Sequence, residues 1–142
     1  MHENLKILMS FDFGKKRIGV AIGQTVTQTA RPLVTLNAKD GIPDWQTITP
    51  LINKWRPDAI VVGIPLNMDG SEQPITASAR TFANTLKAQY NLPVFEMDER
   101  LTTKDARERI FSEGGYKALQ EGQVDQVAAQ LILQNWFAEN LK

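Results

Sequence analysis

Two short apolar runs near the start of the chain predict a β-hairpin. Leu5–Phe11 and Arg17–Ile22 are rich in branched side chains, and a turn containing Gly14 separates them. Runs of this length and composition are typical of strands, and the short turn favours antiparallel pairing. A third run, Thr29–Leu36, contains Pro32, which a strand accommodates at a sheet edge or a bulge. We therefore expect a three-stranded meander.

The middle of the chain alternates helical and strand patterns. Asp44–Trp55 has apolar residues at helical spacing, although Pro50 must either kink this helix or mark a late start after Thr49. The uninterrupted apolar run Ala59–Ile64 is typical of a central strand covered on both faces. Helical spacing returns over Pro74–Tyr90, with the expected core positions Ala79, Phe82, Ala83 and Leu86.

The last third of the chain predicts one more strand and two helices. Pro93–Met97 is the strand, and it runs directly into Asp98-Glu99-Arg100. Thr102 or Thr103 caps the next predicted helix, which ends at a glycine pair. The closing helix, Val124–Leu141, is amphipathic, with the expected core positions Val124, Val127, Ala128, Leu131, Ile132 and Phe137. The element order indicates a mixed α/β domain, with a five-stranded sheet flanked by helices.

Acidic residues stand where predicted strands end. Asp12 follows the first strand, and Asp98 and Glu99 follow the last one. Active sites of such sheets tend to lie at the carboxyl ends of parallel strands. A partly buried carboxylate needs a cation, a hydrogen-bond network or a metal, and Gly14 would let a phosphate or metal approach the backbone. Asp12 taken alone fits equally well as the opening residue of a turn.

Composition narrows the class of protein. The 142 residues suit one domain, 1–142, and the absence of cysteine excludes disulfide scaffolds and thiol catalysis. The N-terminus lacks the apolar core of a signal peptide, and the longest apolar run is too short to cross a bilayer. We therefore expect a cytoplasmic protein without membrane contact. Since the formal net charge is zero, local clusters or metal ions would have to hold any polyanion.

Four motifs, in the same order and spacing as in a known family, cover nearly the whole chain. They are Asp12-Phe13-Gly14 with Lys16-Arg17-Ile18-Gly19-Val20-Ala21, Val62 to Gly70, Asp98 to Thr103, and Val124-Asp125. Together they resemble the YqgF family, also called RuvX. The resemblance implies an RNase H-like fold and a nuclease that matures the 5′ end of pre-16S ribosomal RNA. The family is also described as Holliday-junction-resolvase-like. Ile64 and Thr102, where Leu and Ser are common, are conservative departures.

The resemblance also implies a set of catalytic acids. RNase H-like enzymes cleave phosphodiesters with acids that hold two divalent cations about 4 Å apart. Asp12 would be the bridging ligand, Glu99 the second and Asp125 the third. Their hard oxygen atoms suit Mg²⁺ or Mn²⁺.

Two of these acids have alternatives. Asp98 and Glu99 are adjacent, so on a strand they point to opposite sides; we favour Glu99 as the ligand. Asp125 could instead be placed for the dipole of a helix N-terminus.

Basic residues near the acids are candidates for nucleic-acid binding. Lys16 and Arg17 follow Asp12, Arg100 follows Glu99, and all three match family positions, as does Arg80. They would contact phosphates or balance the acids, and Arg80 could pair with an acid instead. Lys15 fits better as a solvated turn residue. The polar loop from Leu66 to Glu72, with its Asp69-Gly70 turn, could form a lid.

The sequence gives weaker support to several other functions. The three tryptophans favour core packing over base stacking because of their helical placement, and the terminal His2 makes histidine catalysis improbable. The chain is too short for a two-lobed ATPase of the actin and sugar-kinase type and lacks a Walker loop. A Holliday junction resolvase and a non-catalytic RNA-binding module stay open. The expected partner is a nucleic acid, either pre-16S rRNA or branched DNA. Ribosomal precursor particles are a further expected partner, and the protein would work as a monomer or a homodimer.

Overall fold

The computed structural model describes residues 4–99 and 121–141. Three helices and six strands are named within them: β1 (Ile7–Asp12), β2 (Arg17–Gln24), β3 (Thr29–Lys39), β4 (Ile42–Pro43), α1 (Trp45–Trp55), β5 (Ala59–Ile64), α2 (Pro74–Tyr90), β6 (Val94–Asp98) and α4 (Glu121–Asn140). The predicted α/β class and all five predicted strands are confirmed. The helix predicted to follow Thr102 or Thr103 lies outside the described residues.

The strands form one sheet in the order β4-β3-β2-β1-β5-β6. β1 pairs antiparallel with β2 and parallel with β5, and β6 pairs parallel with β5. The meander is therefore confirmed, and β1 lies near the middle of the sheet. The expected irregularity at Pro32 is also present, because the β2–β3 register shifts between Val20 and Ala21. The sixth strand, β4, was not predicted from its two residues.

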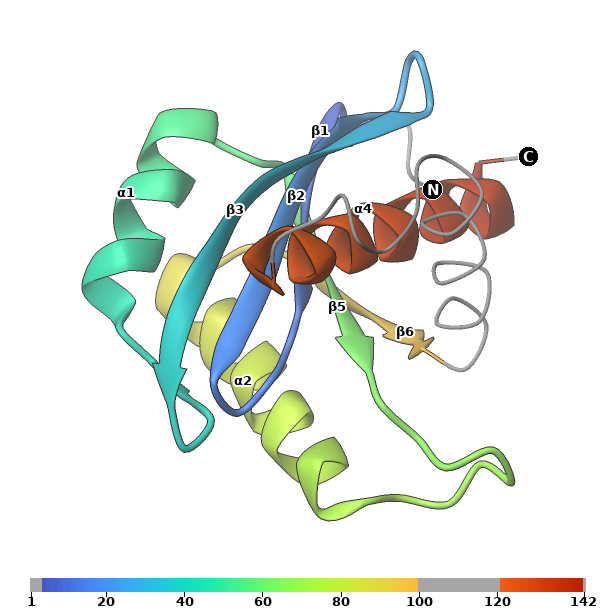
Figure 1. Ribbon diagram of the computed structural model, residues 1–142. Coiled ribbons are helices and arrows are strands. Elements are labelled where there is room, and N and C mark those ends of the chain that lie inside the picture. Colours follow the sequence, from blue (N-terminus) through green and yellow to red (C-terminus); the bar gives the residue numbers. More distant parts are fainter. Residues whose placement is uncertain (1–3, 100–120, 142) are drawn as a thin grey trace.

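The helices form a layer on each side of the sheet (Figure 1). α1 and α2 cover one face, where their buried residues pack against Met9, Phe11 and other strand residues of the same parity. α4 crosses the opposite face and packs against Leu8 of β1 and Val61 of β5. Because successive strand residues point to opposite sides, β1 and β5 supply both cores. β5 is apolar on both faces, as expected for the centre of a three-layer domain, and β1 departs from this only at Ser10 and Asp12.

Helix α1 begins earlier than one of the two predictions for it. The side chain of Asp44 accepts a hydrogen bond from the backbone N–H of Gln46 and caps a helix that continues through Pro50. A late start after Thr49 is therefore wrong. The helix ends at Trp55. Its C-cap, Arg56, has left-handed backbone, and it precedes Pro57, which disfavours helical backbone in the residue before it.

Helix α4 buries a slightly different stripe from the predicted one. Leu131, Ile132 and Phe137 are buried as predicted, whereas the three expected core residues of its first turns are only half-buried. The buried stripe also includes Ala129, Leu133 and Trp136. The side chain of Trp136 is buried, which confirms the prediction of core packing for this tryptophan. Among the described residues, no helix has the length and hydropathy needed to span a membrane.

Candidate active site

Asp12 lies at the carboxyl end of β1 on the face covered by α4. It follows Leu8 and Ser10 at a spacing of two residues, and both of these face α4. In the sheet register, Asp12 is opposite Gly19 of β2 and Gly63 of β5. A glycine therefore stands on each side of this carboxyl group. Both glycines leave room above the sheet that other acidic residues use.

Glu99 enters the space above Gly63. It follows the α4-facing residues Phe95 and Met97 at the same spacing of two, just beyond the end of β6. A Cβ atom built on Gly63 would lie 2.6 Å from Oε1 of Glu99, closer than real Cβ contacts allow. The absence of a side chain at Gly63 is therefore required for this position of Glu99. Asp98 precedes Glu99 at the strand end and has the opposite parity.

Asp12 and Glu99 form a hydrogen-bonded carboxyl pair. Burial is the main factor that raises the pKa of Asp12 well above its usual 3.8, and the bond to Glu99 and the charges of Glu99 and Asp125 act in the same direction. Burial also raises the pKa of Glu99, as does the charge of Asp98, while the bond with Asp12 lowers it. Both carboxyl groups are therefore easier to protonate than they would be in water, since two partly buried carboxyl groups in contact resist being ionised together.

Asp125 reaches the same edge from the first turns of α4. Gly19 allows this approach, because a Cβ atom there would lie 1.9 Å from the backbone oxygen of Asp125. One turn further along, the buried hydroxyl of Ser10 donates a 2.6 Å hydrogen bond to the carbonyl of Ala129, which ties α4 to β1. Arg17 of β2 donates from Nε to Oδ2 of Asp125 over 2.9 Å. The third predicted acid is thus paired with one of the basic residues predicted to bind nucleic acid.

The donor set fits a hard divalent cation in its chemistry. Three carboxyl groups gather at one sheet edge, and the charges of two of them raise the pKa of Asp12, which is the mutual repulsion that a cation would relieve. Within residues 4–99 and 121–141, however, no three acidic, histidine or cysteine side chains form a preassembled metal-binding group. Asp125 is turned toward Arg17, so its carboxylate would have to move to join the other two.

The other predicted basic residues have different surroundings. Lys16 is exposed, and its backbone carbonyl accepts a 2.8 Å hydrogen bond from Ala38 in β3. Arg80 of α2 pairs with Glu72 and, over 3.6 Å, with Glu96 of β6. Of the two alternatives for Arg80, pairing with acids is therefore observed. Arg100 lies outside the described residues.

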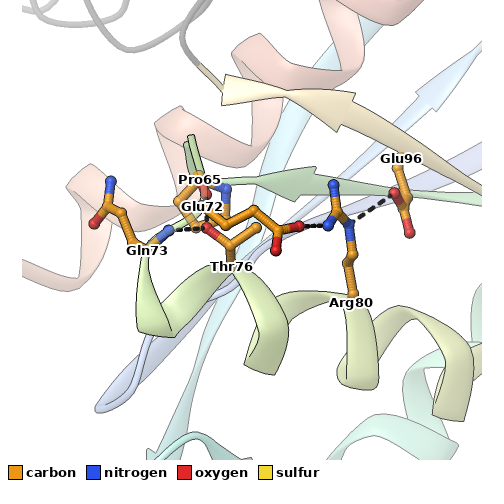
Figure 2. A network of polar contacts seen from close by, with 6 residues as sticks. All are labelled: Pro65, Glu72, Gln73, Thr76, Arg80 and Glu96. Atoms are coloured by element: carbon orange, nitrogen blue, oxygen red, sulfur yellow. Dashed lines mark hydrogen bonds and ion pairs between the residues drawn. The ribbon is translucent and has the colours of Figure 1, made fainter. Parts of the chain in front are cut away.

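The loop predicted as a lid is a small folded hairpin. Leu66 bridges Glu72, and the N–H of Asn67 donates to the carbonyl of Ser71 over 2.9 Å. Figure 2 shows how α2 holds both ends of this loop: Thr76 donates to the carbonyl of Pro65 and accepts from the N–H of Gln73, while Arg80 links Glu72 to Glu96. The exposed Met68 stands near its tip. Whether the loop moves over the acids stays a prediction.

Sequence reasoning overlooked the two glycines that make the site possible. Gly19 and Gly63 both lie inside strands, where glycine is unfavourable and often marks a close approach of backbone or ligand. That signal was present in the sequence. The identity of the approaching groups was not, because Asp125 and Glu99 come from distant parts of the chain.

The sheet order, the helices on both faces and the acids at one strand end define an RNase H-like α/β protein. The family model described as "RuvX: Holliday junction resolvase" matches residues 6–139. The chain belongs to this family.

Curated relatives match almost the whole chain. A protein of Shewanella oneidensis named "Putative pre-16S rRNA nuclease" is 55% identical over 134 residues, which cover 94% of this chain and 95% of the relative. A protein of Haemophilus ducreyi with the same name is 54% identical over 133 residues, covering 94% and 96%.

Solved structures support the fold. The RuvC protein of T. thermophilus, in complex with a Holliday junction substrate, has a TM-score of 0.61 at 14% identity and covers 96% of both chains. The fowlpox virus resolvase, with Holliday junction DNA, has a TM-score of 0.57 at 14% identity, covering 96% and 99%. At these identities the likeness concerns the fold alone.

Proposed function

We propose that this chain is a metal-dependent nuclease that hydrolyses phosphodiester bonds in the 5′ leader of pre-16S ribosomal RNA. The observation that carries the proposal is the hydrogen-bonded pair of Asp12 and Glu99, with Asp125 near it, at the carboxyl end of β1 in a RuvX-family chain. Relatives that are 53–55% identical over most of their length are named for this activity. We infer a single domain, 1–142, that works in the cytoplasm as a monomer or homodimer on rRNA or ribosomal precursor particles.

All three acids have a task in this proposal. Asp12, central and flanked by glycines, would hold the Mg²⁺ or Mn²⁺ ions together with Glu99 and Asp125. Bound cations supply a hydroxide nucleophile and stabilise the leaving oxygen. Without a cation, burial and the neighbouring carboxyl groups raise the pKa of Asp12, which is the repulsion that a bound cation would relieve. Lys16, Arg17, Arg80 and Arg100 are the proposed contacts for the RNA backbone, and phosphate would have to draw Arg80 away from Glu72.

Cleavage assays on two labelled substrates test the proposal. One substrate is the pre-16S 5′-leader RNA and the other a four-way DNA junction, each with Mg²⁺, with Mn²⁺ or with EDTA. We expect RNA cleavage that requires the metal and is lost in Asp12→Asn. Asp44→Asn is the matched control, because the same substitution at the cap of α1 keeps the cap and leaves the acids in place.

The remaining variants assign the other two acids. We expect Glu99→Gln and Asp125→Asn to lose cleavage, while Asp98→Asn keeps it. A loss in Asp98→Asn with retention in Glu99→Gln would exchange the roles of the two adjacent acids. Binding of the leader RNA without any metal-dependent cleavage would contradict the enzyme and favour a non-catalytic RNA-binding module.

Junction resolution is the second candidate, because the matching family model is described as a Holliday junction resolvase. A resolvase cuts two strands symmetrically, for which a two-fold dimer is suited. Selective, Asp12-dependent cleavage of the four-way junction, together with a dimer in solution, would favour it over the rRNA nuclease.

A further inference from the structure

Arg17 forms an ion pair with Asp125, one of the three proposed metal ligands. Its Nε atom lies 2.9 Å from Oδ2 of Asp125, a partner 108 residues away in the sequence. The two side chains are 35% and 25% exposed, so water screens this pair less than it screens an ion pair on the open surface. The contact joins the start of β2 to the first turns of α4.

The backbone around this pair limits where the Asp125 carboxylate can go. Gly19, two residues beyond Arg17 and on the same face of β2, lies directly against the backbone of Asp125. Ser10 fixes the next turn of α4 through the carbonyl of Ala129. Since the helix is held at both points, Asp125 has mainly its own side-chain rotation with which to exchange partners. Rotation toward Asp12 would take its carboxylate away from Arg17.

We propose that Arg17 is a competing counter-ion that a divalent cation must displace from Asp125. The inference deepens the proposed function and rests on it. A guanidinium group keeps its charge throughout the physiological pH range, so deprotonation cannot release Asp125 and only exchange of partners can. Arg17 therefore stabilises the cluster of Asp12, Glu99 and Asp125 when no cation is bound. It also lowers the affinity of these acids for the cation. A residue that only positioned Asp125 as a ligand would have the opposite effect on affinity.

Mn²⁺ binding to the full chain, measured by calorimetry without RNA, tests the sign of this effect. We expect Arg17→Gln to bind Mn²⁺ roughly fivefold or more tightly than the wild type, since the competing ion pair is removed. Arg31→Gln is the matched control, because Arg31 lies opposite Ile22, away from Arg17 along β2, and contacts the ring of Trp55 instead of an acid of the site. Its Mn²⁺ affinity should equal that of the wild type. In an Asp125→Asn background, Arg17→Gln should no longer tighten binding.

Thermal unfolding supplies a second readout. In EDTA, Arg17→Gln should unfold at a lower temperature than the wild type, because α4 loses its ion pair to β2. Saturating Mn²⁺ should reduce or reverse that difference. Equal or weaker Mn²⁺ binding by Arg17→Gln, with wild-type binding that depends on Asp12, would overturn this inference and leave the proposed nuclease intact. Failure of the wild type to bind Mn²⁺ at all would overturn the inference together with the metal chemistry of the proposed function.

Discussion

The two faces of the sheet carry different side chains at neighbouring positions near the end of β1. On the side of α1 and α2, Phe11 and Phe13 pack against Phe82, with ring centroids 5.5 and 5.2 Å apart. On the side of α4, Asp12 stands between those two phenylalanines in sequence and meets Glu99 instead. The alternation of a strand thus separates packing from chemistry by a single residue. Both faces have an apolar core, but at this end of the sheet one face packs aromatic rings and the other carries the acids.

The largest expected effect comes from breaking the aromatic face. Phe82→Ala removes a buried ring that contacts Phe11, Phe13 and Trp45, and truncations of this kind cost about 3–5 kcal/mol. We expect urea unfolding to show a loss of this size. The specific cleavage rate of the molecules that remain folded should stay near the wild-type value. The exposed Asn84→Ala on the same helix should change neither quantity.

The acid face should respond in the opposite way. Gly63→Ala places a Cβ atom against both Glu99 and Cδ1 of Ile132, so Glu99 must move. Because a displacement of about 1 Å at a reacting group can cost on the order of a hundredfold in rate, we expect a loss of cleavage of roughly that size.

A second substitution separates the packing part of this effect from the catalytic part. Ile132→Val removes the Cδ1 atom that the new Cβ would meet. The clash with Ile132 should also lower the stability of Gly63→Ala. Ile132→Val, added to Gly63→Ala, should recover part of that stability and none of the cleavage rate. Recovery of the rate would mean that the packing of Ile132, and not the position of Glu99, limits activity.

The smallest expected effect is a gain in stability from Asp12→Asn. The pKa of Asp12 is raised in the folded state above its usual 3.8. The stability contribution of this carboxyl group is therefore fully present when the pH is below 3.8, and it is lost as the pH rises through the pKa of the folded state. Asparagine lacks the charge, so the variant should unfold a few degrees above the wild type at neutral pH, where about 1 kcal/mol corresponds to roughly 2–8 °C.

The pH dependence tests the cause of this gain. The difference between Asp12→Asn and the wild type should shrink in acid, whereas Asp44→Asn should give a difference that does not follow this course. A wild type that is more stable than Asp12→Asn at neutral pH would contradict the repulsion between the acids.

Local patterns were sufficient to predict most of the fold. Alternation and helical spacing predicted the five main strands, the observed bounds of α2, and the irregularity at Pro32. The strand β4 was missed because it depends on a tight turn, where Asp40 and Gly41 both have positive φ, and not on an apolar run. The path of α1 through Pro50 was left open, since the cap at Asp44 and tertiary packing decide it.

The sequence offered candidate site residues but not their contacts. Strand ends pointed to Asp12, Asp98 and Glu99, and the choice of Glu99 as a metal ligand stays a prediction. The pairing of Arg17 with Asp125 could not be predicted, because it depends on how far α4 approaches β2 at Gly19. Contacts between segments more than 100 residues apart are set by the packed fold, and local sequence carries little information about them.

The hydrogen bond between Ser10 and Ala129 has a consequence for synthesis of the chain. It joins residues 119 positions apart, the first strand to the last helix. A ribosome that adds about 5–20 residues each second completes the whole sheet several seconds before α4 can dock. During that interval Asp12 and Glu99 can meet, while Asp125 has not yet been joined to them. The three acids can therefore come together only after α4 has been synthesised and has docked on the sheet.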